Sequence, residues 1–187
     1  KTTMADKETA LIVGAGQGLS ASLARLFASE GMNVAIAARN IDKLAGLCSD
    51  TGARAYGCDA VDAGQVDALF AAVTADIEEP DVVVYNASNR ARGPIQELDI
   101  EAVRAAIEIS CFGGFLVAQA AAKQMIARNK GTILLTGASA SVKGYPNSSS
   151  FAMGKFGLRG LAQSLARELQ PQNIHVAHFV IDGGILQ

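Results

Sequence analysis

The amino-acid sequence predicts a single α/β domain in which helices cover both faces of a parallel sheet, and three observations lead to this fold class. Short apolar runs alternate with longer segments of helical periodicity along the whole chain. A glycine-rich turn directly follows the first apolar run. The chain has 187 residues, of which 50% are hydrophobic, enough for one substantial core. We therefore expect one doubly wound domain over residues 1–187, with right-handed crossovers between parallel strands.

Six short segments are predicted as strands because they are largely apolar, as strands covered on both faces of a parallel sheet are. The fourth segment, for example, reads Val-Val-Val-Tyr. The predicted strands span residues 10–13, 33–37, 53–57, 82–85, 132–136 and 176–181.

The segments between the strands have the spacing and the end signals of helices. The last one carries leucines on one side at helical spacing and is followed by Pro171. Asn40 and Asp99 are suited to cap the second and fourth helices. The predicted helices span residues 20–30, 40–49, 63–77, 99–128 and 151–169.

The composition excludes several classes of protein. Sixteen Lys and Arg stand against eighteen Asp and Glu, so no excess of positive charge is available for a nucleic acid. No apolar run approaches the roughly 18 residues of a membrane helix, and the polar start lacks the pattern of a secretory signal. The three cysteines form no CxxC pair, so we expect neither a metal site nor a disulfide framework. The expectation is a cytoplasmic protein without nucleic-acid or membrane partners.

The glycine-rich turn is the most informative motif. Gly14-Ala15-Gly16-Gln17-Gly18-Leu19 lies between the first strand and the first helix. Glycines there allow a tight turn and a close approach of the backbone to a pyrophosphate, while amides of the helix N-terminus face the anion. We expect Gly14, Gly16, Gln17, Gly18 and Leu19 to bind a nucleotide cofactor. A purely structural turn is the alternative, because Leu19 stands where the common G-x-G-x-x-G pattern has its third glycine.

The end of the second strand bears on the choice of nicotinamide cofactor. An acidic residue there would bind a free ribose 2′-hydroxyl, whereas an arginine accommodates a 2′-phosphate. Arg39 follows this strand, with no acid before Asp42, which favours NADP(H) and leaves NAD(H) as the alternative. Asp59 and Ala60, after the third strand, are expected at the adenine edge. Capping of the next helix is the other role open to Asp59.

These motifs resemble those of the short-chain dehydrogenase/reductase family over essentially the full chain. The Gly14–Gly18 turn is similar to the family's TGxxxGxG, with Ser20 in place of the last glycine. Tyr85-Asn86-Ala87-Ser88 is similar to its NNAG, and Phe151-Ala152-Met153-Gly154-Lys155 is similar to its YxxxK. The resemblance implies a Rossmann-like fold and a cofactor site that includes Asn86, Ala87 and Ser88.

The resemblance also implies an active site of Asn, Ser, Tyr and Lys, whose positions fall on Ser110, Ala138, Phe151 and Lys155. In the family, the tyrosine phenol exchanges a proton with the substrate oxygen while hydride moves at the nicotinamide. Phenylalanine has no such proton, and the loss of a positioned acid–base group removes about 10²–10⁴-fold in rate. Lys155 is expected to hold the hydroxyls of the nicotinamide ribose. A surface lysine at the start of a helix is the alternative.

Hydroxyl groups near these positions are candidates for a substitute proton donor. Ser139 is the tentative choice because it adjoins Ala138, and Ser141, Tyr145 and the serines at 148–150 are further candidates. For each of them, a loop hydroxyl that satisfies the backbone is the alternative. His178 is expected to be a packed or edge histidine.

The chain also departs from the family near its end. The family has Pro-Gly after the sixth strand, where this chain has Ile181-Asp182-Gly183-Gly184. Family members then continue through a substrate-covering segment and a seventh strand. The sequence therefore predicts that the C-terminal substrate segment is lacking, either because the protein is short or because part of it is absent from this sequence.

Two hypotheses about function follow. The first is an NADP(H)-dependent oxidoreductase that transfers hydride between the cofactor and a small carbonyl or alcohol substrate through a non-standard proton donor. The second is a catalytically inactive nucleotide-binding sensor or interaction subunit with the same fold, which predicts cofactor binding without turnover. A homodimer or homotetramer is expected under either hypothesis, because the family commonly pairs the helices that follow the fourth and fifth strands.

Overall fold

The computed structural model describes residues 7–183 and contains one six-stranded sheet, in which all neighbouring strands run parallel. The strand order is β3-β2-β1-β4-β5-β6. This arrangement confirms the doubly wound, Rossmann-like α/β fold. The strands are β1 (Thr9–Val13), β2 (Asn33–Ala38), β3 (Arg54–Gly57), β4 (Val82–Tyr85), β5 (Gly131–Thr136) and β6 (Ile174–Phe179).

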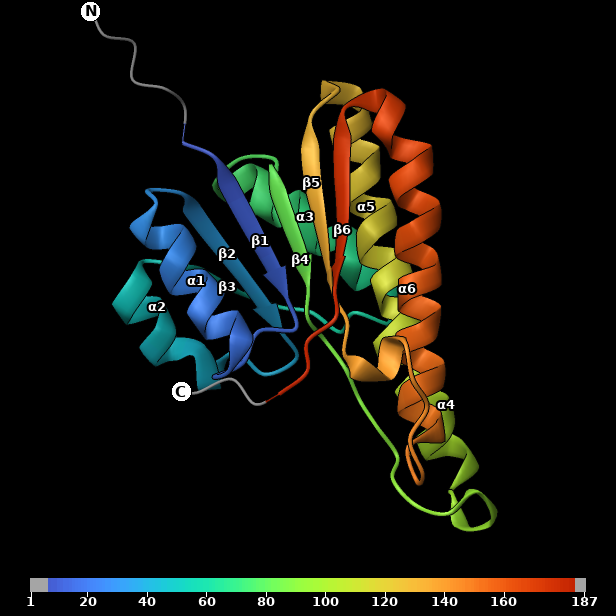
Figure 1. Ribbon diagram of the computed structural model, residues 1–187. Helices are drawn as coiled ribbons and strands as arrows, with labels where there is room; N and C mark the ends of the chain where they lie inside the picture. Colours follow the sequence, from blue (N-terminus) through green and yellow to red (C-terminus); the bar gives the residue numbers. More distant parts are fainter. Residues whose placement is uncertain (1–6, 184–187) are drawn as a thin grey trace, which may run out of the picture.

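Helices cover both faces of this sheet (Figure 1). Because alternate strand residues point to opposite faces, the protein has two hydrophobic cores. Ile12 and Ile36 face one core, beneath α1 (Leu19–Ser29) and α2 (Ala45–Thr51). Leu11 and Val13 face the other core, which is closed by α3 (Ala63–Asp76), α5 (Gly113–Arg128) and α6 (Ser149–Leu169).

Most element ends differ from the prediction by one or two residues, as at the sixth strand, and the start of the second helix differs by more. The sixth strand begins at Ile174 rather than at residue 176, because Ile174 pairs with Gly131 at the start of β5. The predicted helix over 40–49 is a 3₁₀ turn at Asp42–Leu44 followed by α2. Asn40 still acts at this start, since its side-chain oxygen accepts the Asp42 amide at 3.0 Å.

The predicted helix over residues 99–128 is interrupted. α4 (Ile100–Ile107) is capped by Asp99, as predicted, and then passes into a π-helical turn at Glu108–Phe112 before α5 begins. The Tyr85 hydroxyl, at the end of β4, donates a hydrogen bond to the Ile109 carbonyl inside this turn. Such turns open the regular helical ladder and are frequent at functional sites.

The helical stretch Ile100–Arg128, counted through its π-helical turn, bears on what the sequence predicts about membranes. By length and composition alone it is apolar enough to cross a membrane, although it contains no unbroken apolar run of that length. Half of its most apolar window is buried inside the protein, and α5 packs on β4, β5 and α3. The core helices of globular domains have the same character.

The strand order reverses between β1 and β4, and this reversal positions the site. The chain leaves β1 toward β2 and leaves β4 toward β5, so the two connections diverge at the carboxyl edge of the sheet. Val13 pairs with both Ala37 and Tyr85. The segments that follow β1, β2 and β4 therefore meet at one crevice.

Candidate active site

Two cavities open at this crevice and together form one cleft. The smaller, of about 370 Å³, lies at the ends of β1, β2 and β3. The larger, of about 700 Å³, lies between the segments that follow β4, β5 and β6 and the start of α6. Asn86 and Ser88, just after β4, line both cavities. A dinucleotide laid across the sheet would therefore have its adenosine in the smaller cavity and its nicotinamide in the larger one.

The glycine turn between the cavities is shaped for an anion. Gly14 has a φ of +86°, and a Cβ there would collide with the Ala87 backbone, so only glycine fits. A Cβ on Gly16 or Gly18 would meet nothing within 4 Å. α1 begins directly after Gly18 without an acidic side chain or a side-chain cap in its first turn. Its first amides are thus available to a pyrophosphate.

Ser20 and Asn86 hold this turn in place. The Ser20 hydroxyl accepts the Gly16 amide at 3.2 Å and donates to the Gly14 carbonyl at 3.3 Å. The side-chain amide of Asn86 donates to the same Ser20 oxygen at 3.0 Å. Asn86 thus connects the end of β4 to the phosphate turn. Ser20, which the sequence did not identify as a site residue, has a bracing role that becomes visible only from these contacts.

Most of the residues predicted for the cofactor line the cleft, whereas Gly18 lines neither cavity. Gly14, Arg39, Asp59, Ala60 and Ala87 line the smaller cavity, and Leu19 and Lys155 line the larger one. Gly16 and Gln17 line a separate hollow between α1 and α2, where the Gln17 side chain is exposed.

The capping role that the sequence left open for Asp59 is wrong. The N-cap of α3 is Asp62, whose carboxylate accepts the Gln65 amide at 3.0 Å. One Asp59 carboxylate oxygen instead accepts the Val61 amide at 3.3 Å. Asp59 therefore remains at the wall of the smaller cavity.

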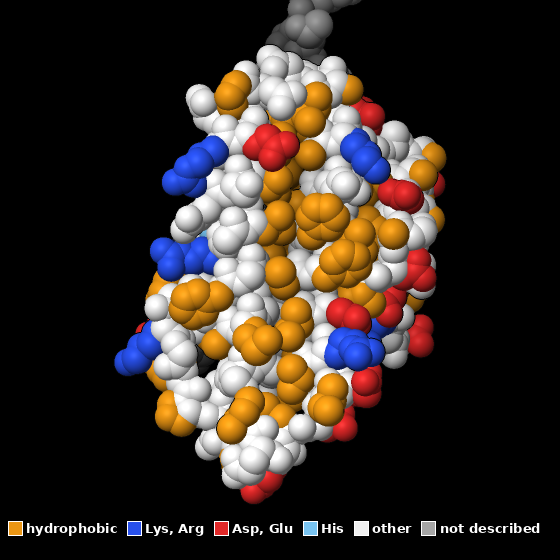
Figure 2. All heavy atoms as spheres, turned by 90° about the vertical axis from the view of Figure 1, so that its right-hand side faces the viewer, with side chains coloured by type: hydrophobic (Ala, Val, Ile, Leu, Met, Phe, Trp, Pro, Cys, Tyr) orange, Lys and Arg blue, Asp and Glu red, His pale blue; other side chains and the backbone are white. Residues whose placement is uncertain are grey.

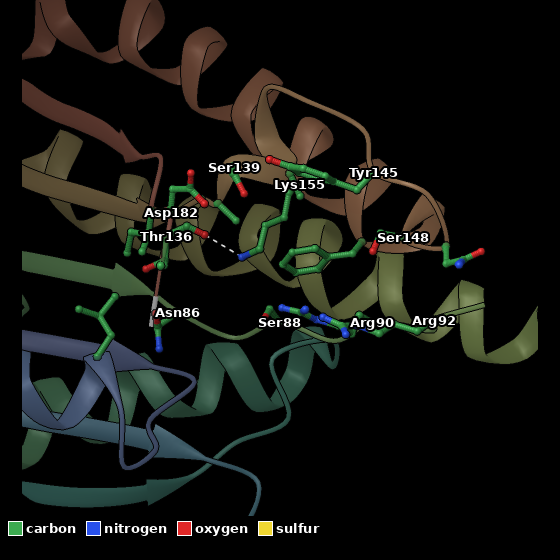
Figure 3. A pocket seen from close by; sticks show the side chains of 18 of the residues that line it. Asn86, Ser88, Arg90, Arg92, Thr136, Ser139, Tyr145, Ser148, Lys155 and Asp182 are labelled. Atoms are coloured by element: carbon green, nitrogen blue, oxygen red, sulfur yellow. Dashed lines mark hydrogen bonds between the residues drawn. The ribbon is translucent and has the colours of Figure 1, made fainter. Parts of the chain in front are cut away.

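Lys155 is the central charged group of the larger cavity. It lies in the second turn of α6, its residue surface is only 3% exposed, and its Nζ donates to the Thr136 carbonyl at 2.8 Å (Figure 3). Burial, with a further contribution from the Arg90 charge, lowers the pKa of Lys155 to about 8. An ammonium has three N–H donors, so two remain for a ligand.

Phe151 stands where the family has its tyrosine, and cations flank its ring. The Arg90 guanidinium carbon lies 4.0 Å from the ring centroid, and the Lys155 Nζ lies 5.7 Å from it. Phe151 is buried and lines the cavity. It presents an apolar surface there and no proton.

The other two positions of the family's active site have different surroundings. Ser110 is fully buried, and its hydroxyl bonds both the amide and the carbonyl of Asn89 at 3.1 Å. It is not among the residues that line the larger cavity. Ala138 does line the cavity, and its amide donates to the Ser141 hydroxyl at 3.0 Å.

The candidate proton donors differ in where they lie. Ser139, Tyr145 and Ser148 line the larger cavity. Ser141 and Ser150 are fully buried and bond the backbone, at Ala138 and Ala91 respectively. These two serines therefore follow the structural alternative. Ser149, in the first turn of α6, does not line the cavity.

His178 has a packed environment, as predicted. Its Nε2 is buried and has no hydrogen-bond partner within residues 7–183, and a Cβ added to Gly137 would collide with its ring. Burial, with smaller contributions from Arg159 and Lys155, lowers its pKa. His178 does not line the larger cavity.

The larger cavity is also lined by residues that the sequence did not single out for the site, among them Arg90, Arg92, Thr136 and Asp182. Thr136 ends β5, and the other three lie in the segments that follow β4 and β6. This place at the carboxyl edge of a parallel sheet is the signal that could have identified them. Within residues 7–183, no group of three or more His, Cys, Asp or Glu side chains is arranged to hold a metal ion.

The fold and the cleft define a class of protein: nucleotide-binding proteins of the Rossmann type with a second cavity for a small molecule. Comparison with known sequences gives the family. The family described as short chain dehydrogenase matches residues 8–185, and the chain belongs to it. Trans-4-hydroxycyclohexanecarboxylate dehydrogenase of Sinomonas cyclohexanicum is 34% identical over 181 residues, which cover 91% of this chain and 70% of that protein.

Solved structures agree with this assignment. A short-chain dehydrogenase from Rhodopseudomonas palustris has a TM-score of 0.88 at 38% identity, covering 94% of this chain and 85% of that one. NAD⁺-bound xylitol dehydrogenase has a TM-score of 0.91 at 27% identity, with 96% and 72% covered. An actinorhodin polyketide ketoreductase with NADPH has a TM-score of 0.90 at 27% identity, with 94% and 70% covered. Similar structures thus hold either nicotinamide cofactor.

Proposed function

We propose that this protein is an NADP(H)-dependent oxidoreductase that moves hydride between the nicotinamide and a small carbonyl or alcohol substrate, with Lys155 as its proton donor. The observation that carries this proposal is the continuity of the cleft. The cavity at the phosphate turn and the cavity that contains Lys155 share Asn86 and Ser88, so a bound dinucleotide would end beside Lys155. When bound, the cofactor supplies or accepts the hydride.

The residues at the cleft fit such a cofactor. The open space above Gly16 and Gly18 and the uncapped start of α1 suit a pyrophosphate. Arg39 is exposed at the end of β2, on the wall of the smaller cavity. Its guanidinium supports the preference for NADP(H), because it can pair with a ribose 2′-phosphate.

Lys155 suits the proton step better than the neighbouring hydroxyls do. With a pKa of about 8, it carries a proton at neutral pH and releases it readily. In carbonyl reduction, hydride adds to the carbonyl carbon and the ammonium gives its proton to the oxygen. The resulting neutral amine regains a proton from water. Ser139 and Tyr145, which line the same cavity, are placed to orient the substrate oxygen.

Cofactor choice is tested by fluorescence titration of the cofactor-free protein with NADPH and, in parallel, with NADH. We expect tighter binding of NADPH, and Arg39→Ala should weaken it at least tenfold while leaving NADH unchanged. Arg104→Ala is the matched control, because Arg104 pairs with Glu101 on the exposed surface of α4, away from the cleft. Equal binding of the two cofactors, unaffected by Arg39→Ala, would contradict the NADP(H) preference.

Catalysis is tested by NADPH oxidation with a panel of small aldehydes and ketones. Lys155→Arg keeps the positive charge but holds its proton too tightly to give it up, so it should retain cofactor binding and lose turnover. Carbonyl reduction should decline above pH 8, as Lys155 loses its proton. Tight cofactor binding without any turnover would instead support the sensor or interaction-subunit hypothesis.

We also propose that the protein assembles as a homodimer or homotetramer through the face that carries α6. Figure 2 shows hydrophobic side chains gathered on this face. The exposed apolar residues of α6 and of the neighbouring helical segments include Met153 and Phe156 on α6, and Phe112 and Phe115, whose rings stack with centroids 6.2 Å apart. We call these four residues the outer apolar patch. Sedimentation velocity would test the assembly, and a monomer at micromolar concentration would contradict it.

A further inference from the structure

Two arginines that follow β4 line the larger cavity beside the candidate catalytic centre. Arg90 and Arg92 are both exposed toward it. Among residues 7–183, neither guanidinium takes part in an ion pair. Two neighbouring positive charges that no acid of the described chain balances favour an anionic ligand.

The backbone on either side of Arg90 is held by two fully buried serines. Ser110, from the π-helical turn, bonds the amide and the carbonyl of Asn89, each at 3.1 Å. Ser150, from α6, accepts the Ala91 amide at 3.0 Å and donates to the Ala91 carbonyl at 2.8 Å. We call these contacts the serine clamps. Because they fix both neighbours of Arg90, the direction in which its side chain leaves the backbone is set before a ligand arrives.

The Arg90 side chain is also ordered by the aromatic ring beneath it. Its guanidinium carbon lies 4.0 Å from the centroid of the Phe151 ring, a favourable cation–π distance. A guanidinium stacked on a ring keeps N–H groups at its edge for bidentate contact with a carboxylate or phosphate. The same ring lies 5.7 Å from the Lys155 Nζ, so a small molecule can reach both cations.

Among residues 7–183, the one acidic side chain that lines this cavity lies away from the two arginines. Asp182, after β6, is beside Thr136 and Ser139, whereas Arg90 and Arg92 lie at the other end of the cavity (Figure 3). The charge is therefore divided, with the acid near the end of β5 and the positive charge near the segment that follows β4.

From this arrangement we infer that the substrate carries a carboxylate or phosphate group, which pairs with Arg90 and Arg92 while its carbonyl or hydroxyl group faces Lys155. The substrate class is thus a small oxo or hydroxy acid, or its phosphorylated counterpart. The part of this inference that concerns the carbonyl or hydroxyl group at Lys155 rests on the proposed function. The anion-binding end rests on the two arginines, the serine clamps and the ring of Phe151.

The kinetic test compares 3-, 4- and 5-oxo acids with their methyl esters, which have the same carbonyl and no charge. We expect the acids to be preferred at least tenfold in kcat/KM. Arg90→Gln should raise KM for the acids at least tenfold, with a smaller change in kcat, and so remove the preference for acids over esters. Arg90→Lys, which keeps the charge and loses the planar fork, should be intermediate. Arg104→Gln, the control for a lost surface charge, should change neither.

A binding test that needs no turnover separates this inference from the proposed function. The protein saturated with NADP⁺ is titrated with benzoate and with inorganic phosphate by isothermal calorimetry. Saturable binding of benzoate, of phosphate or of both, lost in Arg90→Gln, supports the anion site even if no carbonyl is reduced, and the stronger of the two identifies the anion. Turnover of esters and acids alike, with no binding of either anion, would overturn the inference and leave the proposed function standing.

Discussion

Replacing Lys155 by methionine removes a buried charge while keeping a flexible side chain of similar length. Burial and the nearby Arg90 charge lower the pKa of Lys155 from 10.5 to about 8. Because a tenfold change in proton affinity corresponds to about 1.4 kcal/mol, the buried ammonium costs the folded state about 3 kcal/mol at neutral pH. Loss of the bond to the Thr136 carbonyl offsets about 1 kcal/mol of this. We expect Lys155→Met to be about 2 kcal/mol more stable than the natural chain at pH 7.

The pH dependence of this difference has a definite sign. Between pH 8 and 10.5 the unfolded chain binds the Lys155 proton and the folded chain does not, so the stability of the natural protein rises with pH. The methionine variant lacks this rise, and its advantage should shrink across that window and reverse near its upper end. Lys155→Met should also lower the rate of turnover about 10²–10⁴-fold, because it removes the proposed proton donor.

Urea unfolding of the cofactor-free protein at pH 7, 8, 9 and 10 measures these differences. Lys143→Met, which removes an exposed lysine of the neighbouring loop, is the control and should show neither the gain nor its pH dependence. This expectation would be refuted if Lys155→Met were less stable than the natural chain at pH 7, or if the difference in their free energies of unfolding were constant with pH. Lys155 would then not be a buried group that readily releases its proton.

Four further substitutions test other parts of the protein. Gly14→Ala should destabilise the fold by roughly 2–5 kcal/mol, because Gly14 has a positive φ and the added Cβ would collide with the backbone that follows β4. Gly16→Ala should leave the unfolding midpoint unchanged and weaken NADPH binding, since its Cβ enters the open space above the turn. Thermal unfolding measures the stability of each variant, and fluorescence titration measures its NADPH affinity. Phe151→Tyr places a phenol beside the lysine and should raise carbonyl reduction at least tenfold in steady-state assays; an unchanged rate would count against a proton-limited reaction. Phe156→Glu charges the exposed face of α6 and should lower the sedimentation coefficient to that of a monomer, without a change in NADPH affinity.

Much of the fold was predictable because its signals are local. The apolar runs of the six strands and the glycine turn after β1 depend on neighbouring residues, and each strand lies within two residues of its predicted position. The π-helical turn at Glu108–Phe112 was not predictable in this way, because it contains a hydrogen bond from Tyr85, more than twenty residues earlier. The start of β6 likewise depends on its pairing with β5.

The candidate site shows the same distinction between local signals and contacts with distant segments. Motif positions led to Asn86, Arg39 and Lys155, all of which line the cleft. The position of Arg90 depends on Ser110 and Ser150, which come from two other segments of the chain. The lowered pKa of Lys155 depends on burial, which no spacing along the sequence reports.

The serine clamps connect the interior of the site to the outside of the protein. Ser110 belongs to the same π-helical turn as Phe112, and Ser150 lies one turn before Met153 on α6. The two segments that hold the loop carrying Arg90 thus also carry three exposed residues of the outer apolar patch, Phe112, Met153 and Phe156. Association through that patch would make both the π-helical turn and the start of α6 more rigid, and with them the two serine clamps. We therefore expect the affinity for the anionic group to rise with protein concentration, so that quaternary assembly tunes substrate capture without contributing any residue to the cavity.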